Sequence, residues 1–199
     1  QSIAVEHCLF CPPAGRVCSD KIRVLIMMKA LYEPRTFFAL LLIAAMGILG
    51  TALASQYFGG LQPCPLCLWQ RYPYVIVIGL GGVGFGLAGH TTMAARASLL
   101  STIAILAALA LYIDAGIAAF HVGVEQHWWE GLQSCSAAPI SGSIEALGAQ
   151  LLGTPIVRCD EVAWSLGGIS MAGYNFITAL GLGIITTRAA QVMKANHGG

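Results

Sequence analysis

The sequence has little charge and no long run of basic residues. Only 10% of its 199 residues are charged, where a soluble globular domain carries about 25%. Ten basic and nine acidic residues leave a net charge of +1, so the chain lacks the basic surface that holds nucleic-acid phosphates. Hydrophobic residues make up 57% of the chain, and the mean hydropathy is +0.75. So few polar residues cannot cover a folded surface in water, which predicts an integral membrane protein in a lipid bilayer, with no nucleic-acid partner.

Four apolar stretches are long enough to cross a bilayer as helices, which takes about 20 residues each. They cover residues 36–55, 72–89, 97–120 and 165–187. None alternates between apolar and polar residues as the strands of a membrane barrel do. Before the last stretch, Ile140, Ile144, Leu147 and Leu151 recur at helical spacing, which predicts a short helix on the membrane surface. We therefore predict an all-α membrane protein: a bundle of four transmembrane helices with this surface helix in its second outer loop.

Basic residues indicate which way the bundle faces. Arg35 precedes the first stretch, Arg96 lies between the second and third, and Arg188 follows the fourth. Because basic residues concentrate on the cytoplasmic side, we expect both termini there and the loops 56–71 and 121–164 outside. The chain then divides into a cytoplasmic extension (1–34), the four-helix domain (35–188) and a cytoplasmic tail (189–199). Alternatively, the first stretch is a cleaved signal peptide, although it is longer than the usual apolar core of one.

One histidine and three cysteines gather near the start of the chain: His7, Cys8, Cys11 and Cys18. These side chains could ligate zinc, but their spacing matches no standard zinc finger, and we predict no metal site. Two methionines at positions 27 and 28 directly precede the first apolar stretch. We expect residues 1–26 to be foreign to the native protein.

Cys64 and Cys67 form a Cys-Pro-Leu-Cys motif at the start of the second stretch. Such a short spacing closes a very small ring, which constrains the unfolded chain little but is typical of redox-active dithiols. Pro65 suits the first position of a helix, and Arg71 follows Cys67 by four residues on one helical face. The helix N-terminus and the guanidinium together predict a lowered pKa for the Cys67 thiol. A structural disulfide and a metal site are the alternatives for this pair.

Two further cysteines, Cys135 and Cys159, lie in the long outer loop. An even number of cysteines on the oxidising side of a membrane predicts disulfides. The loop pair is either a static staple or a second redox-active disulfide that relays electrons to the first pair.

The sequence resembles the disulfide bond formation protein B (DsbB) family of bacterial inner-membrane thiol oxidases. The resemblance covers about residues 35–188. It rests on the four stretches, on Pro63 and the Cys-Pro-Leu-Cys motif with Arg71 after it, and on Arg-Cys-Asp-Glu at residues 158–161 with Trp164 beyond. It implies an enzyme that reoxidises a periplasmic DsbA-like thioredoxin-fold protein. The electrons would pass through two cysteine pairs to a membrane quinone, either ubiquinone or menaquinone.

The resemblance also implies a role for each cysteine. Cys67 would engage the quinone, with Arg71 close to the quinone ring, and Cys64 would be its dithiol partner. Cys135 would form the mixed disulfide with the soluble protein, and Cys159 would exchange with Cys64.

Two other interpretations remain open at this point. A vitamin K epoxide reductase-like protein also combines four helices, a CxxC motif and a quinone, but there the motif follows the loop pair, and here it precedes it. A non-enzymatic membrane module would use its cysteines only as staples. Gln70 is a departure from the DsbB pattern, since an acidic residue precedes the arginine in well-known members, and this leaves the quinone preference open.

Three polar residues mark the outer end of the third stretch. Asp114 lies within the apolar segment, where it could pair with a neighbouring helix or pass protons to reduced quinone. His121 lies where the chain leaves the membrane, and it could bind the quinone and protonate its oxygens or be an ordinary interface residue. We expect Glu125 to be an ordinary loop residue.

Overall fold

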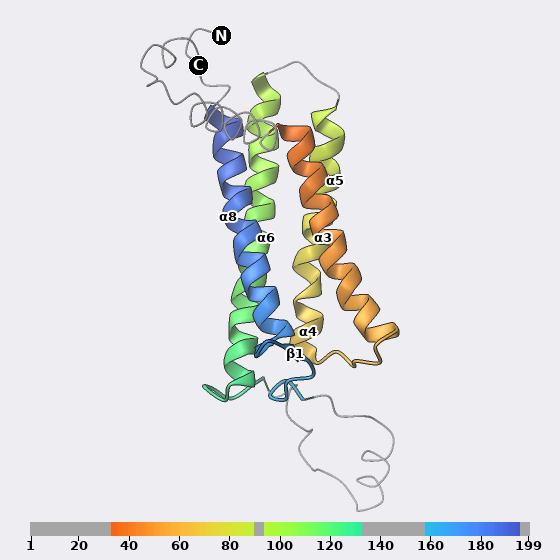
Figure 1. Cartoon of the computed structure of the whole chain (residues 1–199). Helices are drawn as coiled ribbons and strands as arrows, with labels where there is room; N and C mark the ends of the chain where they lie inside the picture. Colours follow the sequence, from red (N-terminus) through yellow and green to blue (C-terminus); the bar gives the residue numbers. More distant parts are fainter. Residues whose placement is uncertain (1–32, 90–93, 133–157, 196–199) are drawn as a thin grey trace, which may run out of the picture.

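The computed structural model describes residues 33–89, 94–132 and 158–195, and shows a bundle of long helices with one small hairpin (Figure 1). The helices are α3 (Pro34–Tyr57), α4 (Pro65–Trp69), α5 (Arg71–Ala88), α6 (Ala94–Glu125) and α8 (Met171–Ala195), and the strands are β1 (Ser165–Leu166) and β2 (Ile169–Ser170). Four helical segments are long and apolar enough to cross a membrane, with α4 and α5 together forming one of them. The predicted four-helix membrane fold is confirmed, while the predicted surface helix lies outside the described residues.

Successive membrane-spanning segments run in opposite directions along the bundle, with α4 and α5 continuing in one direction (Figure 1). The start of α3, the end of α5, the start of α6 and the end of α8 therefore lie together at one end. The opposite end holds α4, the last turn of α6 and the hairpin. The Cys-Pro-Leu-Cys motif and the segment that begins at residue 158 are thus brought to the same end of the molecule.

The fourth helix starts later than the apolar stretch at residue 165 predicts. Ser165 pairs with Ser170, and Leu166 with Ile169, in an antiparallel hairpin that precedes α8. Its two turn residues are Gly-Gly at 167 and 168, with φ of 58° and 82°. Two successive positive φ values suit the tight turn that best matches strand twist, and glycine adopts them without a steric penalty. α8 then continues to Ala195, so the predicted tail at 189–199 begins inside the helix.

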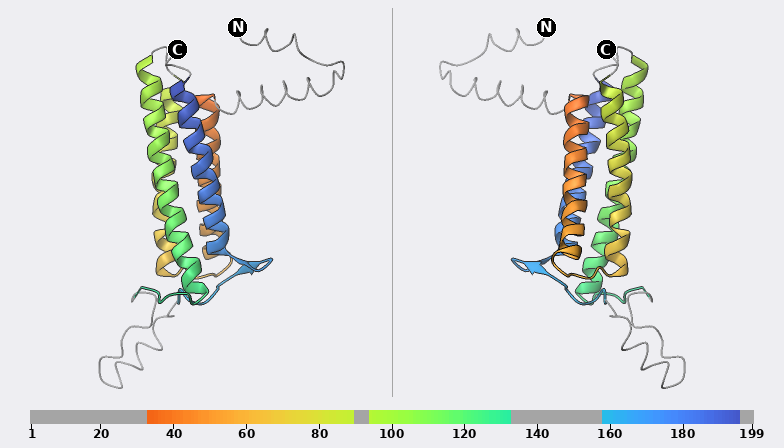
Figure 2. Two further views of the ribbon diagram at one scale, coloured as in Figure 1. Left: turned by 90° about the vertical axis from the view of Figure 1, so that its left-hand side faces the viewer. Right: turned by 90° about the vertical axis from the view of Figure 1, so that its right-hand side faces the viewer.

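The long helices pack side by side in the order α3, α5, α6 and α8. α6 contacts α8 most extensively, and it also packs on α5, which in turn packs on α3. The main core lies along these interfaces and includes the fully buried side chains of Phe38, Val77 and Leu111. α3 and α8 make only marginal contact with each other. Figure 2 shows the same arrangement from both sides.

The contact between α3 and α5 depends on two glycines. A small-xxx-small pattern predicts close packing at Gly82 and Gly86, but both are exposed, and a Cβ added to either would meet nothing within 4 Å. Gly81 and Gly84 face α3 instead. A Cβ on Gly84 would lie 2.5 Å from the Phe38 ring, which is fully buried. The spacing pattern is therefore offset from the face that packs, because α5 turns Gly81 and Gly84 toward α3.

We expect Gly84→Ala to destabilise the bundle. The added methyl group overlaps the Phe38 ring, and overpacking of this kind costs about 1–3 kcal/mol. Gly86→Ala is the matched control, because it gives the same gain in helix propensity without a clash. Thermal unfolding in detergent measures both. Equal unfolding temperatures for the two variants would contradict the assigned α3–α5 contact.

Candidate active site

Cys64 is the N-cap residue of α4, and Cys67 is the third residue of the helix. The Cys64 backbone is extended (φ −72°, ψ 165°), and Pro65 fills the first helical position. This conformation turns the Cys64 sulfur back over the helix start, where it accepts a hydrogen bond from the Cys67 backbone N–H at 3.2 Å. The two sulfurs are 2.7 Å apart, and both cysteines are free. The motif therefore forms a dithiol in which a sulfur takes the place that a serine or aspartate oxygen fills in other caps.

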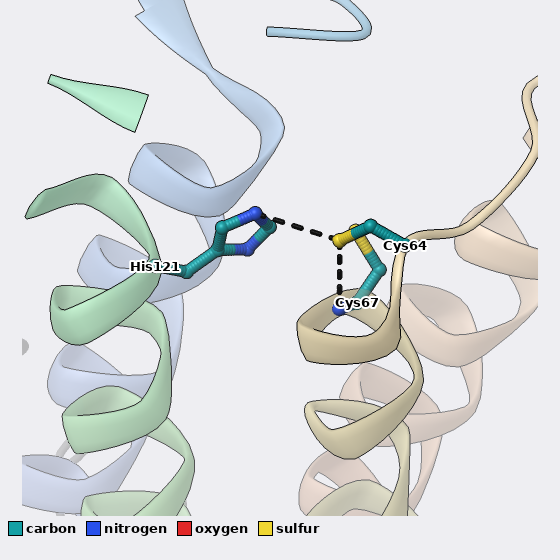
Figure 3. A group of neighbouring side chains, drawn as sticks. All are labelled: Cys64, Cys67 and His121. Atoms are coloured by element: carbon teal, nitrogen blue, oxygen red, sulfur yellow. Dashed lines mark hydrogen bonds between the residues drawn. The ribbon is translucent and has the colours of Figure 1, made fainter. Parts of the chain in front are cut away.

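His121 reaches this dithiol from the last turns of α6. Its Nε2 lies 3.6 Å from the Cys64 sulfur (Figure 3). Hydrogen bonds from the Cys67 side chain, which contribute most, and from His121 together outweigh the opposing effect of burial and lower the pKa of the Cys64 thiol to about 4. The reduced site therefore holds its negative charge on Cys64.

Arg71 forms a hydrogen bond with α3. The sequence predicts its guanidinium beside Cys67, and in the structure Arg71 Nη1 donates to Gln56 Oε1 of α3 at 2.7 Å, while Arg71 and Cys67 line the same cavity. Within the described residues, the contacts that stabilise a thiolate converge on Cys64 rather than on Cys67. The reason is the cap geometry, which turns the first sulfur, not the second, toward the donors at the helix start.

A cavity of about 470 Å³ extends from the dithiol into the space between α3 and α8. Its wall includes Cys64, Cys67, Arg71 and His121, together with apolar side chains of α3 and α8. Its volume falls within the range of about 300–1,000 Å³ typical of small-molecule sites. The structure thus brings four of the predicted site residues to one cavity.

Cys159 lies close to the dithiol. It is fully buried and belongs to a small cluster with Cys64, Leu66 and Val124, against which Cys67 packs. Cys159 is disulfide-bonded, and Cys64 and Cys67, as free thiols, are not its partners. Cys135 lies outside the described residues, so the Cys135–Cys159 pair stays a prediction.

The structure adds three polar residues that the sequence does not reveal as site residues. Gln70 Nε2 lies 2.9 Å from His121 Nδ1, and Asn175 Nδ2 donates to Gln70 Oε1 at 2.8 Å. Glu125, expected to be an ordinary loop residue, has a buried side chain; its Oε1 lies 3.9 Å from His121 Nε2, and its Oε2 accepts a hydrogen bond from Ser170 Oγ. The spacing of four residues between His121 and Glu125 is a signal that could have indicated their contact. Nothing in the sequence connects Gln70 with Asn175, which is 105 residues away.

Asp114 pairs with a neighbouring helix, which is one of the two roles predicted for it. It is fully buried in α6, and its Oδ2 accepts a hydrogen bond from Asn175 of α8 at 3.0 Å. It therefore pairs with a neighbouring helix, as a buried polar group in a membrane protein must.

The dithiol and His121 also have the composition of a metal site. The two sulfurs and a ring nitrogen lie within 4.8 Å of one another. They supply three ligands, where structural zinc sites use four.

Membrane-spanning helices around a free dithiol, with a stabilised thiolate and a ligand-sized cavity, are the attributes of a membrane-embedded thiol–disulfide oxidoreductase. Sequence comparison reaches the same class. The sequence model described as Disulfide bond formation protein DsbB matches residues 34–189, and the chain belongs to this family. It is a membrane disulfide bond formation protein, and family membership does not favour the vitamin K epoxide reductase alternative.

Two relatives illustrate the similarity, and both are named Disulfide bond formation protein B. The relative from Verminephrobacter eiseniae (strain EF01-2) is 33% identical, over 76% of this chain and 83% of its own length. The relative from Stutzerimonas stutzeri (strain A1501) is 28% identical, over 78% of this chain and 93% of its own length. No solved structure matches the chain.

We expect His121→Phe to raise the pH at which Cys64 loses its reactivity. Hydrogen bonds to charged groups are worth about 1.5–3 kcal/mol, so losing this donor should raise the midpoint by about 1–2 pH units. In the reduced parent protein, alkylation of Cys64 should stay fast as the pH falls and decline only near the pKa of about 4. Mass spectrometry of the alkylated peptide gives the profile for each cysteine. His127→Asn, which removes an exposed histidine, is the control, and an unchanged midpoint in His121→Phe would exclude His121 as a stabilising donor.

Proposed function

We propose that this protein is an inner-membrane protein-disulfide oxidase that reoxidises a periplasmic DsbA-like thioredoxin-fold protein and passes the electrons to a membrane quinone. The observation that carries the proposal is the free dithiol at the wall of a cavity between membrane-spanning helices. Membership of the DsbB family supports it. A set of structural staples needs neither a stabilised thiolate nor a cavity beside it.

The electrons would enter through the loop pair. A thiolate of the reduced partner attacks Cys135, which breaks the Cys135–Cys159 bond, forms a mixed disulfide and releases the Cys159 thiolate. Cys159 then attacks Cys64, which breaks the Cys64–Cys67 bond and releases the Cys67 thiolate. The second partner thiol resolves the mixed disulfide, so the partner leaves oxidised and Cys135 is freed. The packing of Cys159 in one buried cluster with Cys64 supports the exchange between them.

Cys135 would then attack Cys159, which breaks the Cys159–Cys64 bond, reforms the loop disulfide and releases Cys64 as a thiolate. Free thiols at Cys64 and Cys67 beside a disulfide-bonded Cys159 support this order of steps. Two electrons taken from the partner are now stored in the Cys64–Cys67 dithiol. Its oxidation back to a disulfide releases these electrons and two protons, and completes the cycle.

The cavity fits the head group of a quinone in size and chemistry. Its volume of about 470 Å³ and its apolar lining from α3 and α8 suit a substituted ring, and the marginal contact between these two helices would allow entry from the bilayer. Bound ubiquinone or menaquinone would supply an acceptor for two electrons and two protons. Arg71 and His121 are among the cavity residues that can donate hydrogen bonds to quinone oxygens, and the dithiol lies on the same wall.

The orientation in the membrane follows from the distribution of basic residues. We propose that both termini are cytoplasmic and that the end of the bundle with the dithiol faces the periplasm. The gathering of α4, the end of α6 and the Cys159 segment at one end is consistent with a single periplasmic face for all redox steps (Figure 1). Disulfides persist on that side of the membrane.

Cys64→Ala and Cys67→Ala should each abolish quinone reduction by the reduced partner while the protein stays inserted. Either change removes one sulfur of the dithiol, so no disulfide can form at the cavity. The measurement combines purified protein, quinone and a reduced thioredoxin-fold protein, with thiol trapping of the four outer cysteines. Replacing Cys8, Cys11 and Cys18 by alanine is the matched control and should leave turnover intact. Parent-level turnover in Cys64→Ala or Cys67→Ala would leave only a structural role for the pair.

Arg71→Ala should slow quinone reduction more than it weakens folding. Removal of one preorganised donor costs about 10²–10³ in rate in an enclosed site, and the half-buried Arg71 should fall at or below the lower value. Arg71→Lys should be intermediate, because the charge remains but the planar pair of donors does not. Quinone affinity, turnover and thermal unfolding distinguish the cases. If affinity and turnover match the parent in Arg71→Ala, quinone binds elsewhere and Arg71 is only a membrane-surface anchor.

A further inference from the structure

A chain of hydrogen bonds runs from Asp114, deep in the bundle, to the Cys64 sulfur. Asn175 Nδ2 lies 3.0 Å from Asp114 Oδ2 and 2.8 Å from Gln70 Oε1. Gln70 Nε2 lies 2.9 Å from His121 Nδ1, and His121 Nε2 lies 3.6 Å from the sulfur. Asp114, Gln70 and His121 are all buried, so these groups depend on one another rather than on water.

The groups around Asn175 determine which atom donates and which accepts in each hydrogen bond of this series. Tyr74 donates its hydroxyl to Asn175 Oδ1 at 2.7 Å, and the Asp114 carboxylate accepts. Asn175 therefore uses both amide protons, one toward Asp114 and one toward Gln70. Gln70 must turn its carbonyl oxygen to Asn175, which leaves its NH₂ facing His121. Since an amide NH₂ can only donate, Nδ1 of His121 accepts, and the ring proton resides on Nε2.

The contacts at Nε2 agree with this assignment. The Cys64 sulfur lies 3.6 Å away, and Glu125 Oε1 approaches the same nitrogen at 3.9 Å. Both are acceptors when ionised. A proton on Nε2 therefore meets acceptors, and the lone pair on Nδ1 meets a donor.

The same proton position makes His121 a poor metal ligand. The separation of 3.6 Å between Cys64 Sγ and His121 Nε2 is close to that of two ligands on a tetrahedral zinc ion, about 3.5 Å for Zn–S and Zn–N bonds of about 2.3 and 2.0 Å. A zinc-bound histidine, however, needs a free lone pair on the binding nitrogen and gives the proton on its other nitrogen to an acceptor. Gln70 places a donor where that acceptor would have to be.

We propose that Gln70, held in its orientation by Asn175, is the positioning residue that keeps His121 a donor to the dithiol and withholds it from metal ions. The proposal rests on the proposed function, because a thiophilic ion such as Zn²⁺ would trap the reduced dithiol that must pass its electrons onward. The cluster has the spacing of a three-ligand zinc site, but its hydrogen bonds have the opposite direction.

Gln70→Glu tests the proposal, because a carboxylate of the same shape accepts a proton from Nδ1. In this test the parent is a variant with alanine at the five other cysteines, so that Cys64 and Cys67 are its only thiols. It is kept reduced and free of oxygen. The absorption of bound Co²⁺, followed by displacement with Zn²⁺, measures affinity at about pH 8. Gln70→Glu should bind about 10–100-fold more tightly than the parent, the usual effect of a metal site's outer partners. Adding His121→Phe to Gln70→Glu should remove this gain, whereas His121→Phe alone should leave the parent affinity unchanged.

Asn175→Leu is the second variant and acts from a distance. It frees the Gln70 amide to turn its oxygen toward Nδ1, so metal affinity should rise in the same direction by a smaller factor. Ser101→Ala is the control. It also removes a buried hydrogen bond between α6 and α8, from Ser101 Oγ to the Ala190 carbonyl at 3.0 Å, but this bond is not part of the series from Asp114 to Cys64. Thermal unfolding verifies that each protein is folded.

A parent affinity that falls on His121→Phe, together with no gain in Gln70→Glu or Asn175→Leu, would overturn the proposal. It would mean that His121 already offers Nε2 to the metal. Because the measurement uses no quinone and no protein partner, its failure is distinct from a failure of the oxidase function.

Discussion

Polar groups inside an apolar helix bundle have no water to bond with, so each must find its partner within the protein. The hydrogen-bonded chain from Asp114 Oδ2 through Asn175 and Gln70 to His121 provides such partners and joins α6, α8 and the junction of α4 with α5, while Asp114 Oδ1 has no hydrogen-bond partner among the described residues. Sliding any of these helices would leave several buried donors and acceptors unpaired. The positions of His121 and Cys64, and with them the charge on the dithiol, depend on this constraint.

The remaining long helix, α3, takes no part in this series of hydrogen bonds and is held by other contacts. It packs on α5 through small residues such as Gly84 and through the buried ring of Phe38, and it leaves a gap on the side of α8. Arg71 reaches into that gap and bonds Gln56 of α3. The bundle thus combines a rigid polar side, which sets the chemistry of the sulfurs, with an apolar side that leaves room for a ligand.

Cys64 lies where these features meet. It caps α4, contacts His121, lines the cavity and packs in one cluster with Cys159. A lowered pKa would make its thiolate a good leaving group in the proposed exchange with the loop disulfide. A single sulfur can therefore serve exchange on one side and the cavity on the other, which explains why the donors gather on the first cysteine of the motif.

The sequence alone determined the four membrane spans, because each is a long apolar run, and it indicated the dithiol, because a short cysteine spacing at a helix start has few other uses. It also placed Arg71 and His121 near the site. Tertiary structure decided which sulfur carries the charge, because the cap conformation of Cys64 and the approach of His121 arise only when α4 and α6 pack. It moved the start of α8 beyond a Gly-Gly hairpin and turned Gly81 and Gly84, not Gly82 and Gly86, toward α3. Gln70 and Asn175 could not be predicted as partners, since hydrogen bonds between residues so far apart in the chain leave no periodic pattern, and only the folded bundle brings them together.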